Sequence, residues 1–257
     1  MADEPGGRTD KLGNRYERNC IIKSILDVAD EKISSCMFEG LGEDERATDI
    51  IVTNFDGTRK YIQCKHRYGS NDNWTFSGLK SYDLLKRWKF HLDRDKNITV
   101  SLESPIPFTR LNDLIAKAKN NNGDVKIFYN EQIKRSNETY NDFKKYCNEL
   151  ELDCSNINDV QKAMNYLRRT DIEDMSDNSI NKLLFMHIKL LFIGDEEDNY
   201  EKILNLVCNS DIMGTEIDIH FLHTFFKSNN MVLNNLSNSS HDFENIERLN
   251  KNFKDSI

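Results

Sequence analysis

The sequence predicts an α/β protein built on a mixed sheet. Residues 48–53 and 59–65 are short apolar runs rich in β-branched residues, and Asn-Phe-Asp-Gly at 54–57 joins them with the chemistry of a tight turn, which is typical of a hairpin. Two further short apolar runs each follow a stretch with apolar residues at helical spacing. A hairpin followed by helix–strand pairs forms a mixed sheet with helices packed on it.

The other elements of the first half follow from local patterns. Residues 1–14 are polar and glycine-rich, so we expect a loop there. Residues 15–34 carry apolar side chains three and four positions apart, which predicts an amphipathic helix, and 36–41 suit a short strand. After the hairpin the patterns predict helices over 79–90 and 111–119 and strands over 98–104 and 125–130.

The pattern changes at about residue 138. From there the periodic apolar segments all favour helices, separated by Asn, Asp and Ser turns: 139–150, 158–168, 179–193, 199–208 and 216–227. We therefore expect a core over 1–135, an all-helical extension over 136–230, and a linker with a short terminal helix over 231–257 that leads toward a further module.

Composition narrows the class of protein. The 257 residues carry a net charge of −8, but residues 1–150 hold 25 basic and 24 acidic side chains, and the segment 59–96 holds 10 and 4. Any contact with phosphates is therefore expected in the first half. The six cysteines form no CxxC pair, which indicates a reducing cytosol, and no secretory or membrane-spanning segment is expected. The common NTPase, zinc-protease, serine-hydrolase and dinucleotide motifs are absent.

Three polar residues are expected to meet at one end of the hairpin. Asp49 opens its first strand, and Gln63 and Lys65 lie two apart on the second, so their side chains share a face. The Asp49 carboxylate, the Gln63 side-chain carbonyl and the Cys64 backbone carbonyl suit a hard divalent cation, Mg²⁺ or Mn²⁺. Lys65 would orient water or stabilise charge on a phosphate, so this set suits phosphodiester hydrolysis.

A fourth ligand is expected from the first helix. Glu17 shares the apolar face of that helix, where a charge needs a partner, and a metal ion would supply one. A solvated helix position is the alternative for Glu17. For Asp49 and Lys65 the alternative is an ordinary turn residue and an ordinary strand-end cation, because the spacing of these residues alone is not specific.

These motifs resemble a known family. The order Glu17, Asp49, Gln63-Cys64-Lys65 resembles PD-(D/E)xK nucleases of the Mrr-like branch in which Gln replaces the second acid. The segments GGRTDKLGNRYERN, GEDERATDIIVTN, DGTRKYIQCKHR and NWTFSGL resemble the N-terminal double-stranded-DNA endonuclease domain of CD-NTase-associated endonucleases and antiviral STAND ATPases (Avs), over roughly residues 6–80. Two departures are Thr48 where the motif has Pro and the neutral Gln63, which weakens the metal site.

The resemblance implies a restriction-endonuclease-like core and a bacterial, cytoplasmic, metal-dependent endonuclease that cleaves double-stranded DNA in antiphage defence. It further implies activation by self-association into a dimer or tetramer, and fused ATPase and sensor modules. Two alternatives stay open: an inactive fold that binds nucleic acid or oligomerises, and a nuclease directed at RNA. The residues expected to contact nucleic acid are Gly6, Gly7, Arg8, Arg67, Lys80, Lys86 and Arg87.

Overall fold

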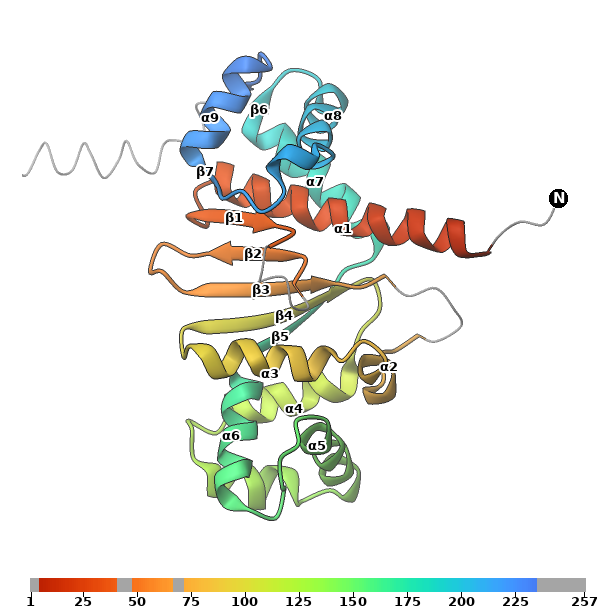
Figure 1. Cartoon of the computed structure of the whole chain (residues 1–257), viewed down its shortest axis with the longest axis vertical. Helices are drawn as coiled ribbons and strands as arrows, with labels where there is room; N and C mark the ends of the chain where they lie inside the picture. The colour runs from red at the N-terminus through yellow and green to blue at the C-terminus, as the bar shows by residue number, and fades with distance from the viewer. Residues whose placement is uncertain (1–4, 41–47, 67–71, 235–257) are drawn as a thin grey trace, which may run out of the picture.

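A six-stranded mixed sheet forms the centre of the molecule (Figure 1). This computed structural model describes residues 5–40, 48–66 and 72–234. The strand order is β5-β4-β3-β2-β1-β7; neighbours from β7 to β3 are antiparallel, and β3, β4 and β5 run parallel. The strands are β1 (Ser35–Phe38), β2 (Ile50–Thr53), β3 (Arg59–Cys64), β4 (Ile98–Ser104), β5 (Thr170–Asp174) and β7 (Ile217–Asp218).

Helices cover both faces of the sheet, and each face has its own hydrophobic core. Figure 1 shows α1 and α7–α9 on one side and α2–α6 on the other, an arrangement that buries both faces of the parallel strands. The helices are α1 (Pro5–Ala29), α2 (Phe76–Lys80), α3 (Leu84–Arg94), α4 (Thr109–Lys119), η2 (Ile127–Ile133), α5 (Asn137–Glu149), α6 (Ile157–Arg168), α7 (Asp177–Leu191), α8 (Glu196–Val207), η3 (Ser210–Ile212) and α9 (Ile219–Ser228). Beside α9, the short strands β6 (Phe192–Ile193) and β8 (Val232–Leu233) pair with each other.

The β2–β3 hairpin determines which side chains reach the candidate site. Ile50 lies opposite Ile62, and both pack in the core under α1, whereas Ile51 and Tyr61 pack in the core under α3. Because side chains alternate along a strand, the odd-numbered positions at the hairpin end face the α2–α3 side. Gly57 closes the turn with a φ of +80°, a conformation that costs glycine little.

The expected α/β class with a mixed sheet is confirmed, and two local expectations are wrong. Residues 5–14 belong to α1, which begins with a proline at its first position, where the missing N–H costs nothing. Residues 125–130 are helical rather than a strand, because the Asp124 side chain accepts hydrogen bonds from the backbone N–H groups of Lys126 and Ile127 and so starts a helical turn.

The expectation that residues 136–230 are all helical is also wrong. This segment supplies β5 to one edge of the central sheet and β7 to the other. Its helices divide between the two faces, with α5 and α6 in the core under α3 and α7–α9 in the core under α1. Edge strands this short and polar lack the apolar alternation that identifies a strand in sequence. The division into domains at residues 135 and 230 stays a prediction.

The expected terminal helix lies in residues 235–257, outside the described part of the chain. Among the helices of the described residues, none combines the length and the apolar character that crossing a membrane requires.

Candidate functional site

The carboxylate of Asp49 is the centre of a polar cluster at the end of the hairpin. Its Oδ2 accepts a hydrogen bond from the Cys64 backbone N–H at 2.6 Å and another from the side-chain amide of Gln63. Burial raises the pKa of Asp49, and Lys65 and these two hydrogen bonds counteract the rise. The backbone N–H of Asp49 donates to the carbonyl of Ile62, which keeps the carboxylate in register with the end of β3.

Lys65 approaches the same carboxylate oxygen. Its Nζ lies 4.0 Å from Asp49 Oδ2 and 5.8 Å from the centroid of the Tyr82 ring. The ring face favours the ammonium group and limits the directions that the flexible side chain can take. The structure therefore brings Asp49, Gln63 and Lys65 together on one face, as the alternation of the hairpin predicts.

Glu17 reaches this cluster from α1. Its pKa is raised to about 7, first by burial and then by the negative charges of Asp49 and Glu39, while Lys65 acts in the opposite direction. Glu39 follows β1 and donates its backbone N–H to the carbonyl of Asp49. Burial and the two neighbouring carboxylates therefore disfavour the charged form of Glu17, and the positive charges of Lys65 and Arg18 only partly offset this effect.

Glu39 and Tyr82 are the site residues that the sequence analysis missed. The pairing of Phe38 with Ile50 places Glu39 beside Asp49, so a correct register for β1 and β2 would have identified it. Tyr82 lies in the connection between two helices, and no local pattern links it to Lys65.

The donor set fits a hard divalent cation. Such ions prefer carboxylate, amide and backbone carbonyl oxygens, and a positive ion would relieve the repulsion between Glu17 and Asp49. The Gln63 amide presents its nitrogen to Asp49; half a turn of that amide presents its oxygen to the same place, as a cation would require. Asp49, Glu17, Gln63 and the Cys64 backbone carbonyl are the groups that would hold Mg²⁺ or Mn²⁺.

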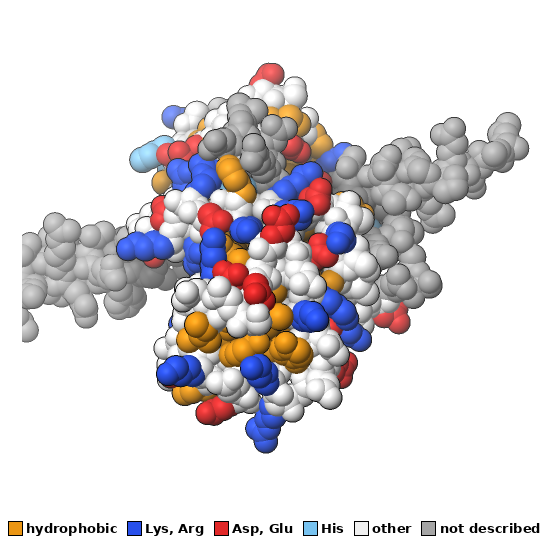
Figure 2. All heavy atoms as spheres, turned by 60° about the horizontal axis from the view of Figure 1, so that its bottom comes forward, with side chains coloured by type: hydrophobic (Ala, Val, Ile, Leu, Met, Phe, Trp, Pro, Cys, Tyr) orange, Lys and Arg blue, Asp and Glu red, His pale blue; other side chains and the backbone are white. Residues whose placement is uncertain are grey.

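The expected nucleic-acid contacts are only partly described. Arg67, the side chain of Arg8 and the surroundings of Gly6 and Gly7 lie outside the described part of the structure. Lys80 pairs with Glu149 at 3.0 Å and Lys86 with Glu151 at 2.9 Å, so each of these exposed lysines has an acidic partner on the surface. Arg87 is exposed on α3. Figure 2 shows acidic and basic side chains interspersed on the face formed by the lower helices, with no continuous basic band.

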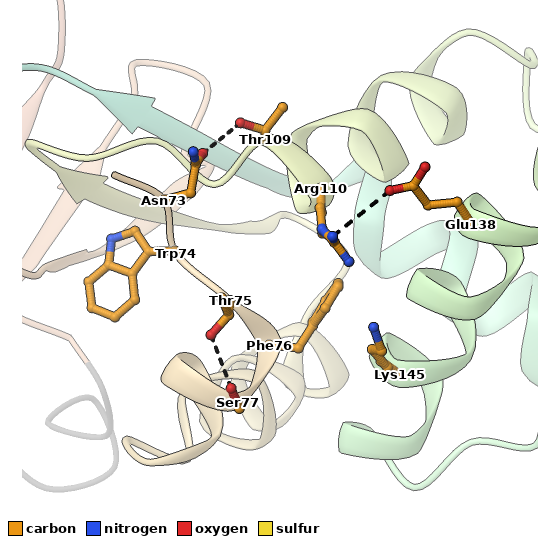
Figure 3. Close-up of a pocket in the computed structure, with 9 residues that line it drawn as sticks. All are labelled: Asn73, Trp74, Thr75, Phe76, Ser77, Thr109, Arg110, Glu138 and Lys145. Carbon is orange, nitrogen blue, oxygen red and sulfur yellow. Dashed lines mark hydrogen bonds and ion pairs between the residues drawn. The ribbon is translucent and has the colours of Figure 1, made fainter. Parts of the chain in front are cut away.

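A pocket of about 690 Å³ opens between α2, α4 and α5 (Figure 3). Its two cations, Arg110 and Lys145, both pair with Asp142, at 3.1 and 3.2 Å. Trp74 lines the pocket and packs edge-on against Tyr82, with the ring centroids 6.2 Å apart. The pocket thus offers little net positive charge.

Comparisons with known proteins identify no family. No family model and no curated protein matches the chain. Among solved structures, the chain is similar to a Cap4 SAVED/CARF-domain containing receptor from Moraxella osloensis, at 15% identity and a TM-score of 0.47, covering 84% of this chain and 48% of that one. It is also similar to the Acinetobacter baumannii Cap4 receptor with the cyclic trinucleotide 3′3′3′-cAAA, at 16% identity and a TM-score of 0.49, covering 89% and 48%.

These findings correct two expectations. The expected family, the double-stranded-DNA endonuclease domain of the PD-(D/E)xK superfamily, is wrong by these comparisons: no family model matches, and the similar structures are described as SAVED/CARF-domain receptors. The expected function, cleavage of double-stranded DNA in antiphage defence, is corrected with it, because the partner named for the Acinetobacter protein is a cyclic trinucleotide. The chain spans about half the length of these structures.

Proposed function

We propose that the end of the β2–β3 hairpin binds Mg²⁺ or Mn²⁺ and hydrolyses a phosphodiester bond. The observation that supports the proposal is the environment of the Asp49 carboxylate. It accepts hydrogen bonds from the Gln63 amide and the Cys64 N–H and lies 4.0 Å from the Lys65 ammonium, and its negative charge helps to raise the pKa of Glu17 to about 7. Carboxylates whose pKa is raised by burial or by a neighbouring charge are concentrated at functional sites, and Glu17 and Asp49 both have a raised pKa.

Each group has a defined task in such a reaction. Asp49 and Glu17 would supply negative oxygens to the cation, and the Gln63 amide a neutral one. The bound cation lowers the pKa of a water molecule and neutralises charge on the phosphate. Lys65, held by Tyr82, is placed to orient that water or to stabilise the negative charge that develops on the phosphate oxygens.

The substrate class follows from this chemistry alone. The site offers the groups that hydrolysis of a phosphodiester needs, and none of its described residues selects a duplex. We therefore propose phosphodiester hydrolysis and do not assign double-stranded DNA as the substrate. Self-association into a dimer or tetramer stays a prediction. Short linear or cyclic oligonucleotides are the substrates to test first, since a cyclic trinucleotide is the ligand named for the Acinetobacter protein.

The direct test uses a chromogenic phosphodiester, bis(4-nitrophenyl) phosphate, with the full chain and added Mg²⁺ or Mn²⁺. We expect release of nitrophenolate that EDTA abolishes and that Asp49→Asn lowers at least about 100-fold. The matched control is the ion pair of Asp113 and Lys117 on the surface of α4: Asp113→Asn and Lys117→Met should leave the rate unchanged. Equal rates in wild type and Asp49→Asn would reject the proposal.

A second measurement addresses the substrate. A linear adenine trinucleotide and 3′3′3′-cAAA are incubated with the chain and Mn²⁺, and the products are separated by chromatography. Metal-dependent linearisation or shortening that is lost in Asp49→Asn supports hydrolysis of oligonucleotides. Binding of either ligand without turnover, combined with no turnover of the chromogenic diester, would identify a binding site instead and overturn the hydrolase.

A further inference from the structure

A second cluster of ligand atoms lies on the opposite face of the sheet. The thiols of Cys20 on α1 and Cys64 on β3 and a carboxylate oxygen of Glu103 on β4 all lie within 4.8 Å of one another. All three residues are buried, at 0%, 4% and 5% exposure. Because Cys64 alternates with Gln63 and Lys65 along β3, its side chain faces α1 and not the carboxylate cluster around Asp49.

We propose that Cys20, Cys64 and Glu103 form a zinc site that ties α1 to the centre of the sheet. Tetrahedral zinc binds thiolate sulfur at about 2.3 Å and carboxylate oxygen at about 2.0–2.2 Å, which places neighbouring ligand atoms about 3.5–3.8 Å apart. The three ligand atoms therefore need to approach one another by only about 1 Å. The hydroxyl of Tyr16 hydrogen-bonds to Cys20 beside this cluster.

The charges around the cluster balance when zinc is bound. Lys23 bridges Glu103 at 3.1 Å and Glu173 at 3.0 Å, and Lys60 contacts Glu173 at 2.6 Å, so two ammonium groups already neutralise two carboxylates. Zn²⁺ adds two positive charges, and the two thiols each release one proton to solvent and become thiolates. Zinc binding thus leaves the net charge of the cluster unchanged and adds no uncompensated buried charge.

The surroundings of Glu103 also suit a metal ligand. The Lys23 ammonium donates a hydrogen bond to Oε1 of Glu103. This bond orients the carboxylate and leaves Oε2 for a cation. Ligating carboxylates in metal proteins are commonly held in this way by an outer hydrogen bond. Within the described ranges, no other group of three such ligands converges.

The test measures bound zinc in the full chain. Reduced protein is loaded with Zn²⁺, excess ion is removed, and zinc per chain is determined by mass spectrometry of the metal. We expect one zinc per wild-type chain and retention at least about tenfold weaker in Cys20→Ser and in Glu103→Gln. The matched control is Cys36→Ser, which removes a buried thiol from the same core and should leave zinc binding intact.

A spectroscopic readout covers the case in which a core variant does not fold. Co²⁺ added to the reduced wild-type chain should give a thiolate-to-cobalt charge-transfer band and the visible bands of a tetrahedral ion, both bleached by Zn²⁺. Absence of these bands in wild type, equal zinc in Cys20→Ser and Cys36→Ser, or a Cys20–Cys64 disulfide in the purified chain would each overturn the site. Asp49→Asn should still bind zinc, so the fate of this site is separable from that of the proposed hydrolase.

Discussion

Lys65 and Asp49 face each other across the open end of the β2–β3 hairpin, with Nζ 4.0 Å from Oδ2. They are sixteen residues apart in sequence, yet the antiparallel pairing that sets Ile50 against Ile62 places one just before β2 and the other just after β3. This separation is long for a direct hydrogen bond and leaves the ammonium group able to contact a phosphate oxygen as well.

Removal of the Lys65 charge should slow catalysis and leave metal binding nearly unchanged. Lys65→Met keeps the length of the side chain but removes its charge, so we expect Mn²⁺ binding within about threefold of wild type and hydrolysis of the chromogenic diester about 10²–10³-fold slower. Titration calorimetry and steady-state rates provide the two readouts. Lys117→Met, on the surface of α4, is the control. Loss of metal binding together with activity would show that Lys65 supports the fold of the site instead.

The pH dependence of stability should report Glu17 in metal-free protein. Its pKa is about 7 in the folded chain against an ordinary value of 4.5, so the folded chain binds this proton more tightly than the unfolded chain. The stabilisation from this proton is present below about pH 4.5 and is lost as the pH rises through about 7. Glu17→Gln should therefore gain stability over wild type with rising pH, by at most about 3 kcal/mol at pH 8.

Urea unfolding in EDTA at several pH values measures this difference. The exposed Glu201 on α8 provides the control, since Glu201→Gln should follow the wild-type pH profile. A constant offset between Glu17→Gln and wild type across the range would contradict a raised pKa for Glu17.

Lys23 should stabilise the buried carboxylate of Glu103 and the half-buried carboxylate of Glu173 beneath α1. In Lys23→Met, Glu173 keeps its contact with Lys60, whereas Glu103 loses the ion pair described for it. We therefore expect the free energy of unfolding to fall by about 3 kcal/mol at pH 7. Two ammonium groups hold the pKa of Glu173 at about 2, below its ordinary value of 4.5. That stabilisation is present above about pH 4.5 and is lost as the pH falls toward 2, so the gap between variant and wild type should narrow in acid.

Thermal or urea unfolding at pH 7 and pH 4 tests the role of Lys23. Lys32 pairs with Asp30 at 2.8 Å but its side chain is 56% exposed, so Lys32→Met should cost less than about 1 kcal/mol. Equal effects of the two substitutions would show that the bridge by Lys23 contributes no more than a surface ion pair.

The hairpin turn should depend on the backbone of Gly57. A Cβ added there meets no atom within 4 Å, but the φ of +80° disfavours any L side chain. Gly57→Ala should therefore lower the free energy of unfolding by about 1 kcal/mol through backbone strain alone, and Gly57→Asn should cost less because asparagine tolerates this region better. Urea unfolding checks both. A larger loss in Gly57→Asn than in Gly57→Ala would contradict this explanation.

Local sequence patterns were sufficient to predict secondary-structure elements where periodicity and turn chemistry agreed. The hairpin, β4 and most helices were predicted because one face of each element is apolar at a regular period. The pattern failed at 125–130, where Phe128, Tyr129 and Ile133 are buried at helical rather than alternating spacing. It also failed at β5, whose charged residue Glu173 is tolerated because Lys23 and Lys60 meet it from α1 and β3.

The sequence by itself determined the hairpin and, through its two-residue alternation, the shared face of Asp49, Gln63 and Lys65. Only the tertiary structure decided that Glu39 joins Glu17 beside this face, and that Cys20 and Glu103 meet Cys64 behind it. The physical reason is distance along the chain. Alternation and helical period act over a few residues, whereas the position of α1 over β3 and β4 results from burial of apolar surface contributed by the whole fold.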